Sequence, residues 1–252
     1  MLLLLASSRC PVDPIGAVNV RNRFEVKDLP QCRRLLDQSE KNLKETYNIV
    51  AMLPKEATPV KRGIETDIIV SIMYGVSPTQ STEIYRQTFT VLEFVKTAGQ
   101  PLNASKQTPP ESGKSHDPDA TSARSVSTMS TSFRMERHDP YGWAALCKDY
   151  NPIHMSPTVA RLFGFKGKIA HGNHVVAKAV ESVLSESPAW IDDSKDIPGT
   201  LQFAMEVVFK RPITVPCELV ATQITQRDKS AVEFNIALKG GTKPSVTVIW
   251  GN

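Results

Sequence analysis

The feature that most constrains the fold of this 252-residue chain is one amphipathic helix followed by a run of strands. From Gly172 to about Ser185, apolar residues recur at helical spacing and form a single stripe, at Val175, Val176, Ala179, Val180, Val183 and Leu184. Beyond this helix, strands are predicted at about Leu201 to Lys210, Cys217 to Arg227, Ala231 to Lys239 and Ser245 to Trp250. Because such a stripe must be covered, we expect an α+β fold in which an antiparallel sheet wraps around a central helix.

The first hundred residues also favour strands. Val18 to Val26 alternates between apolar and polar residues, and Ile64 to Tyr74 and Glu83 to Lys96 predict two longer strands joined by a hairpin loop at Gly75 to Thr82. Residues 33–53 indicate a helix, or an irregular insertion with helical tendency. This half contains strands but little helix before them, so it is expected to be incomplete as a domain.

Residues 103–130 differ from both flanks. Serine and threonine dominate, prolines interrupt any regular structure, and aromatic residues, leucine and isoleucine are absent. Such a segment cannot bury an apolar core, so a disordered linker is predicted. The expected division is therefore a degenerate or truncated first unit at 1–100, a linker at 101–132 and a second domain at 133–252.

Composition narrows the class of protein. Hydrophobic residues make up 40% of the chain and charged residues 22%, and the net charge of +4 is spread without a basic run, which argues against nucleic-acid binding. The four cysteines are far apart, which favours a reduced compartment. The apolar opening Met1 to Leu5 is too short for a signal peptide, and no stretch approaches the roughly 20 residues of a membrane span. An intracellular protein is expected, with cytoplasm and mitochondrion both open.

One loop carries the chemistry. The sequence Asp149-Tyr-Asn151-Pro152-Ile-His154 is followed, seventeen residues after the histidine, by His171-Gly172. Pro152 lacks an N–H and pushes Asn151 out of the α region, so Asp149 and His154 cannot share one regular helix. In a bent loop their side chains can converge on a single water. An acid/base pair beside a helix N-terminus suits the addition of water to an activated double bond.

The segment Tyr141 to Val176 resembles the MaoC-like, hydratase-2 group of (R)-specific enoyl-CoA hydratases, whose pattern is Asp-x-Asn-Pro-x-His followed by an apolar-Ala-His-Gly helix start. The resemblance extends through Phe209 to Ile213 and covers about residues 134–252. More loosely, Pro14 to Arg23 is similar to part of the N-terminal unit of two-hotdog acyl dehydratases. The resemblance implies a hotdog fold, and a double hotdog whose N-terminal unit is incomplete.

It also implies the roles of three residues. Asp149 would act as the base that polarises water, and His154 would orient that water and shuttle the proton. The product of a trans-2-enoyl thioester would be the (3R)-3-hydroxyacyl thioester, with dehydration as the reverse. The backbone N–H of Gly172, at a helix start, would bind the developing enolate oxygen.

Three further residues are expected around the substrate. Asn151 either fixes the loop by hydrogen bonding to backbone or serves only as a turn former. His171 and His174 form an HxxH pair that can suggest a metal, but no third ligand lies nearby in sequence, so His171 is expected to be a hydrogen-bonded residue at the helix start. Arg211, with Lys210, could meet the phosphates of CoA, although a solvated pair of charges is an equal alternative.

The predicted partner is therefore an acyl-CoA or acyl-carrier thioester, with no metal or redox cofactor, no nucleic acid and no membrane span. A homodimer is left open. Two other functions remain possible for such a fold. One is a thioesterase, in which water attacks the thioester carbonyl, and the other is a non-catalytic acyl-binding protein.

Overall fold

The computed structural model describes residues 12, 17–37, 47–53, 57–75, 80–94, 127–186, 202–225 and 232–251. The first half contains β1 (Val18–Val26), α2 (Leu29–Asp37), β2 (Tyr47–Met52), β3 (Thr58–Val60), β4 (Gly63–Gly75) and β5 (Ser81–Glu93). The second half contains β6 (Ser127–Met135), α3 (Asp139–Cys147), α4 (Pro152–Met155), α5 (Pro157–Leu162), α6 (Gly172–Glu186), β7 (Phe203–Phe209), β8 (Cys217–Thr225), β9 (Val232–Leu238) and β10 (Val246–Gly251).

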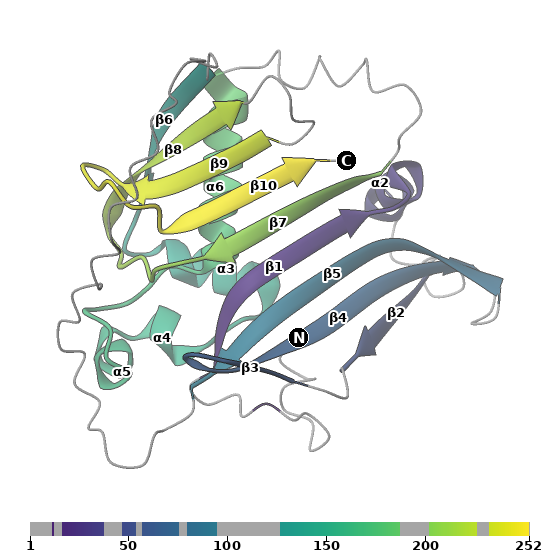
Figure 1. Ribbon diagram of the computed structural model, residues 1–252, viewed down its shortest axis with the longest axis horizontal. Coiled ribbons are helices and arrows are strands. Elements are labelled where there is room, and N and C mark those ends of the chain that lie inside the picture. Colours follow the sequence, from purple (N-terminus) through teal and green to yellow (C-terminus); the bar gives the residue numbers. More distant parts are fainter. Residues whose placement is uncertain are drawn as a thin grey trace, which may run out of the picture.

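The described strands form one antiparallel sheet of ten strands, in the order β2-β4-β5-β1-β7-β10-β9-β8-β6, with β3 beside β4 (Figure 1). The two halves meet in the middle, where β1 pairs with β7 from Arg21↔Val208 to Val26↔Phe203. Backbone hydrogen bonds across this pair make the two half-sheets continuous. The sheet therefore places the first half directly beside the second.

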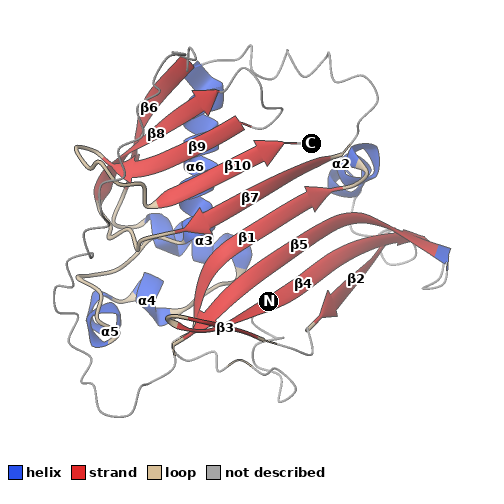
Figure 2. Ribbon diagram, in the orientation of Figure 1, coloured by secondary structure: helices blue, strands red, loops and turns tan. Residues whose placement is uncertain are grey.

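Helix α6 lies along one face of the second half-sheet, behind the strands in the view of Figure 2. Four residues of its predicted apolar stripe are buried, with Val175 at 0% exposure, and they pack on side chains of β8, β9 and β10. The members of this core include Val175, Val176, Ala179, Val183, Leu219, Ile236, Val246 and Val248. The α+β architecture, with an antiparallel sheet around a central helix, is thus confirmed.

In the described part of the first half, α2 is the only helix, and it buries no side chain. The small core there consists of Val12, Ile68 and Val91, with Ala17, Leu53 and Phe89 packed against it. The proposed division at residue 100 lies outside the described residues. None of the described helices is both long enough and apolar enough to cross a membrane.

Three sequence predictions need correction. The pattern of residues 33–53 predicts a helix or an irregular insertion, yet the helix ends at Asp37 and Tyr47–Met52 is the edge strand β2. The predicted linker reaches residue 132, yet β6 begins at Ser127. The bent loop after Asp149 contains one helical turn, α4. Strands β2 and β6 lie at sheet edges, where few side chains are buried and the alternating pattern is weak. The short strand β3 was not predicted either.

Candidate active site

The loop after α3 turns sharply before it reaches His154. Helix α3 ends at Cys147, and its C-cap residue, Lys148, has a left-handed conformation with φ 58°. The Asp149 carboxylate then accepts the N–H of Asn151 at 3.3 Å, and the Asn151 side chain accepts the N–H of Ile153 at 3.3 Å. Asn151 is thus the N-cap of α4, with Pro152 at the first position. The expected hydrogen bond between the Asn151 side chain and the backbone is present, with the Ile153 N–H as its donor.

A second segment, leading into α6, lies against this loop. The N–H of Ile169 donates to the Ile153 carbonyl at 3.3 Å, and the N–H of Ala170 donates to the Ile213 carbonyl at 2.8 Å. His171 is buried, and its Nε2 lies 3.1 Å from the Asp149 carbonyl oxygen. These bonds hold the start of α6 beside the Asp149 loop.

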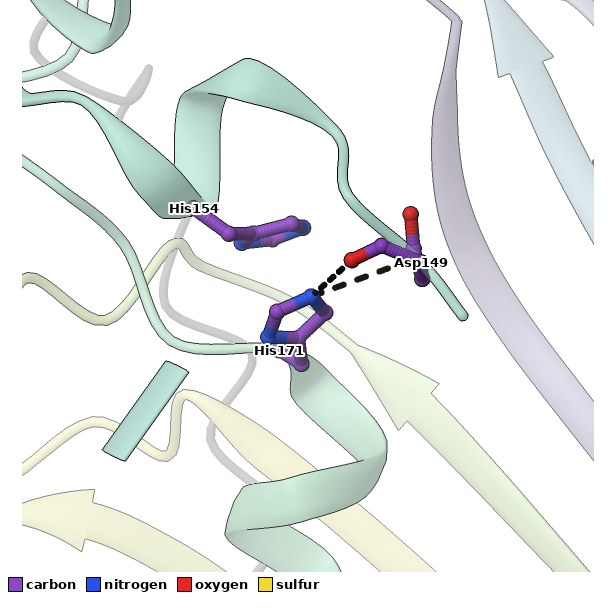
Figure 3. Close-up of side chains that lie close together, drawn as sticks. All are labelled: Asp149, His154 and His171. Carbon is purple, nitrogen blue, oxygen red and sulfur yellow. Dashed lines mark hydrogen bonds and ion pairs between the residues drawn. The ribbon is translucent and has the colours of Figure 1, made fainter. Parts of the chain in front are cut away.

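The three polar side chains converge, as Figure 3 shows. The His154 and His171 rings stack with their centroids 3.8 Å apart, and His171 Nε2 is 3.9 Å from the Asp149 carboxylate. One polar atom from each of Asp149, His154 and His171 lies within 4.8 Å of the others. The prediction that Asp149 and His154 meet across the bend is confirmed.

Hydrogen bonding determines which ring nitrogen of each histidine carries a proton. His154 Nδ1 lies 3.0 Å from the Ile169 carbonyl oxygen, and a carbonyl only accepts. The proton of a neutral His154 is therefore on Nδ1, and Nε2 presents a lone pair. By the same reasoning His171 Nε2 donates to the Asp149 carbonyl.

Both imidazoles are held in the neutral form. Burial is the main cause that lowers the pKa of His154 to about 4, and the neighbouring His171 lowers it further. Burial also lowers the pKa of His171, against the opposing effect of its bond to the Asp149 backbone. At neutral pH the Nε2 atom of His154 is therefore available as a proton acceptor.

Gly172 is the first residue of α6, where N–H groups lack an intrahelical acceptor and the helix dipole is positive. A Cβ on this glycine would lie 2.3 Å from Cε1 of Phe209, the last residue of β7. The absence of a side chain therefore lets the helix start pack directly against the Phe209 ring. Tight packing and an available amide coincide at this residue.

The HxxH pair does not form a metal site. The His174 ring stacks on Trp143, with centroids 4.7 Å apart, and is not part of the convergent group. Asp149, His154 and His171 do offer metal-type ligand atoms at close range. However, His154 Nδ1 and His171 Nε2 are bonded to carbonyls, and the two rings stack face to face, which fits a tetrahedral zinc site poorly.

A cavity of about 690 Å³ contains the site and draws its walls from both halves of the sheet. All six residues predicted from the sequence line it, namely Asp149, Asn151, His154, His171, Gly172 and Arg211. The first half contributes mainly apolar side chains, which include Val18, Val20, Phe89, Val91, Leu92 and Phe94. Lys210 and Arg211 also line the cavity, and Arg211 donates to the Pro244 carbonyl at 3.3 Å. The sequence did not reveal these first-half residues, because their position depends on the β1–β7 pairing.

An antiparallel sheet wrapped around a central helix is the arrangement of the hotdog fold. Residues 113–236 match the family model described as MaoC like domain. Over 128 residues the chain is 27% identical to the 3-hydroxyacyl-thioester dehydratase X of Mycobacterium tuberculosis. That match covers 51% of this chain and only 39% of the relative.

Solved structures share the fold over nearly the whole chain. The crystal structure of HtdX of Mycobacterium tuberculosis superposes with a TM-score of 0.61 at 18% identity, covering 100% of this chain and 82% of that one. A MaoC-like dehydratase from Phytophthora capsici gives 0.58 at 15% identity, covering 95% and 72%. The peroxisomal multifunctional enzyme type 2 of Drosophila melanogaster gives 0.57 at 14% identity, covering 99% and 38%. These likenesses confirm the hotdog fold.

Proposed function

We propose that this chain catalyses the (R)-specific hydration of trans-2-enoyl thioesters to (3R)-3-hydroxyacyl thioesters, or the reverse dehydration. The observation that carries the proposal is the convergence of Asp149 and His154 in a cavity, beside the first amide of α6. The sequence likeness to a 3-hydroxyacyl-thioester dehydratase supports the same class of reaction.

The Asp149–His154 pair would bind and activate one water. The carboxylate of Asp149 and the lone pair on His154 Nε2 both accept hydrogen bonds, so together they can orient both protons of a water molecule. The water oxygen bonds to C3 of the enoyl chain. Its proton passes through the pair to C2, and the product gains one hydroxyl and one hydrogen. Positioned proton transfer of this kind contributes about 10²–10⁴-fold in rate.

Negative charge develops on the thioester oxygen as water adds to C3. The N–H of Gly172 is at the positive end of a 15-residue helix and lines the same cavity, so it is the candidate donor to that oxygen. The loss of such a donor typically costs about 2.7–4 kcal/mol of transition-state stabilisation. The reaction moves only water and protons, so the proposed steps require no metal or redox group.

The remaining walls suit an acyl thioester. Apolar side chains of β1 and β5 would cover the acyl chain, which makes the first half part of the substrate site. Lys210 and Arg211 are the candidate contacts for the phosphates of a CoA or phosphopantetheine carrier. His171 would support the site by holding the Asp149 backbone through its Nε2.

The test is a hydration assay with trans-2-enoyl-CoA substrates of several chain lengths, followed by chiral analysis of the product. Asp149→Asn and His154→Gln should each lower kcat by about 10²–10⁴-fold. His138→Gln, a change at an exposed histidine outside the cavity, should have no effect. Release of free thiol with the double bond intact would instead indicate a thioesterase. Binding without turnover, unaffected by either substitution, would indicate an acyl-binding protein.

A further inference from the structure

Three asparagine side chains form a continuous chain of hydrogen bonds between the first half and the start of α6. Asn19 Nδ2 donates to Asn22 Oδ1 at 2.9 Å, and Asn22 Nδ2 donates to Asn173 Oδ1 at 2.7 Å. Asn22 has no exposed surface, and Asn173 directly follows Gly172. A fully buried side chain of β1 is thus bonded to the first turn of the helix that carries the candidate oxyanion donor.

A bulge in β1 makes this arrangement possible. Residues three apart in a regular strand point to opposite faces of a sheet, so Asn19 and Asn22 would not normally meet. The pairing of β1 with β5 shifts register between Asn19 and Arg21. One inserted residue brings both asparagines to the same face, which is how bulges re-aim side chains near functional sites.

Asn22 is held rigidly. Its backbone lies in the register of both neighbours, opposite Phe89 in β5 and opposite Val207 in β7. Two residues beyond Val207 in the same strand is Phe209, whose ring lies against Gly172. The start of α6 is therefore held by adjacent strands, through a hydrogen bond from β1 and through a ring contact from β7.

Burial of these side-chain amides costs free energy of folding, so their presence points to a task other than packing. An unpaired buried amide costs about 1–3 kcal/mol, and Asn19 Oδ1 is buried with no partner among the described residues. Asn19 and Asn173 both line the cavity, although much of the wall around them is apolar. An apolar side chain would fill the Asn22 site equally well if packing were its only task.

We propose that Asn22 is a positioning residue for the reaction, which acts through Asn173 to fix the backbone amide of Gly172. The inference rests on the proposed hydration of enoyl thioesters. It assigns the first half of the chain a part in the chemistry, beyond covering the acyl chain. Asn22 itself need not touch the substrate, because its hydrogen bond sets where the helix begins.

The test uses Asn22→Leu and Asn173→Leu, which keep the branched shape of asparagine but remove the hydrogen bond. A shift of the helix start should lower kcat by about 10- to 100-fold and leave KM nearly unchanged, since misplacement by 1 Å can cost about 10²-fold. Because the two side chains act as one pair, the double variant should lose no more than the worse single variant.

Thr90→Val is the matched control. Thr90 lies opposite Arg21, is 5% exposed and donates to the Asp67 carboxylate at 2.7 Å, but it does not line the cavity. It should lower the melting temperature without changing kcat. Should Asn22→Leu not fold, the kcat of Asn173→Leu, at the partly exposed end of the same hydrogen bond, tests the proposal instead.

The outcomes separate the two proposals. A wild-type chain that does not hydrate enoyl-CoA would refute the proposed function. If the wild type is active and Asp149→Asn is not, but both leucine variants keep the kcat of the Thr90→Val control, then the positioning role of Asn22 is wrong. Additive losses in the double variant would overturn it as well.

Discussion

Replacement of Gly172 by alanine should damage catalysis more than stability. The new Cβ would lie 2.3 Å from Cε1, 2.6 Å from Cδ1 and 2.8 Å from Cζ of Phe209. Ordinary contact begins at 3.4 Å, so the ring or the helix start must move by roughly 1 Å. The Phe209 ring packs against the core of the second half, so it cannot swing away freely.

This displacement sets the expected magnitudes. Overpacking costs about 1–3 kcal/mol, and the better helix propensity of alanine returns about 1 kcal/mol, so the net loss of stability is about 0–2 kcal/mol. If the start of α6 moves instead of the Phe209 ring, the Gly172 N–H is displaced by roughly 1 Å from the position in which it would donate to the thioester oxygen. A misplacement of about 1 Å can reduce kcat by about 100-fold, which corresponds to about 2.7 kcal/mol.

The assay compares kcat for enoyl-CoA hydration with urea unfolding for Gly172→Ala, Phe209→Leu and the double variant. Phe209→Leu removes two of the three atoms that collide with the new methyl group, Cε1 and Cζ, and replaces the rigid ring by a branched chain that can change rotamer. It should therefore restore both stability and much of the lost kcat in the double variant. Unchanged kcat in a folded Gly172→Ala protein would refute the role of this amide. A double variant that regains stability but not activity would show that the methyl group blocks the substrate directly.

The pH dependence of stability, the binding of the carrier and the packing of the core each give a further test. Burial holds the pKa of His154 in the folded protein at about 4, below its ordinary value of 6.5, so on acidification the unfolded chain takes up this proton at a higher pH than the folded protein does. The free energy of unfolding should therefore fall as the pH drops from about 6.5 towards 4. In urea unfolding, His154→Gln should make this pH dependence weaker. Arg211→Gln should raise KM for a CoA thioester several-fold, and the increase should be smaller at high salt. The same substitution should not change KM for a short thioester that lacks phosphates. Equal changes in KM for the two substrates would contradict a phosphate contact. Leu219→Ala, at a fully buried core position, should lower the free energy of unfolding by about 2–5 kcal/mol, and a loss below about 1 kcal/mol would contradict close packing of the sheet on α6.

The secondary structure could be predicted from the sequence where a helix or strand buries one face and exposes the other. Val175 and Val183 repeat at helical spacing because α6 buries one stripe, and this pattern located the helix to within about one or two residues. Strand β2 gave no such signal, since Ile49, at 75% exposure, and Val50 lie on an edge strand with few covered side chains. In β6, serine and threonine suggested a linker, although their backbone pairs along the whole length of β8.

The residues of the candidate site also fall into those that the sequence could predict and those that it could not. Asp149, His154 and Gly172 lie within 24 residues of one another, and the chemistry of a proline-bent loop before a helix start could be inferred from local order alone. The role of Asn22 could not be predicted from local sequence order, because 151 residues separate it from Asn173. Its role depends on a strand pairing between the halves and on a bulge, and neither leaves a pattern within one segment.

The join between the halves at β1 and β7 has a consequence for how the polypeptide can be divided. The covalent connection runs from β5 to β6, whereas the sheet is held together by backbone pairing elsewhere, from Arg21↔Val208 to Val26↔Phe203. A nick between Glu93 and Ser127 would leave every described strand of this sheet intact. The two fragments, made separately, should therefore reassemble by complementation and recover a working pocket.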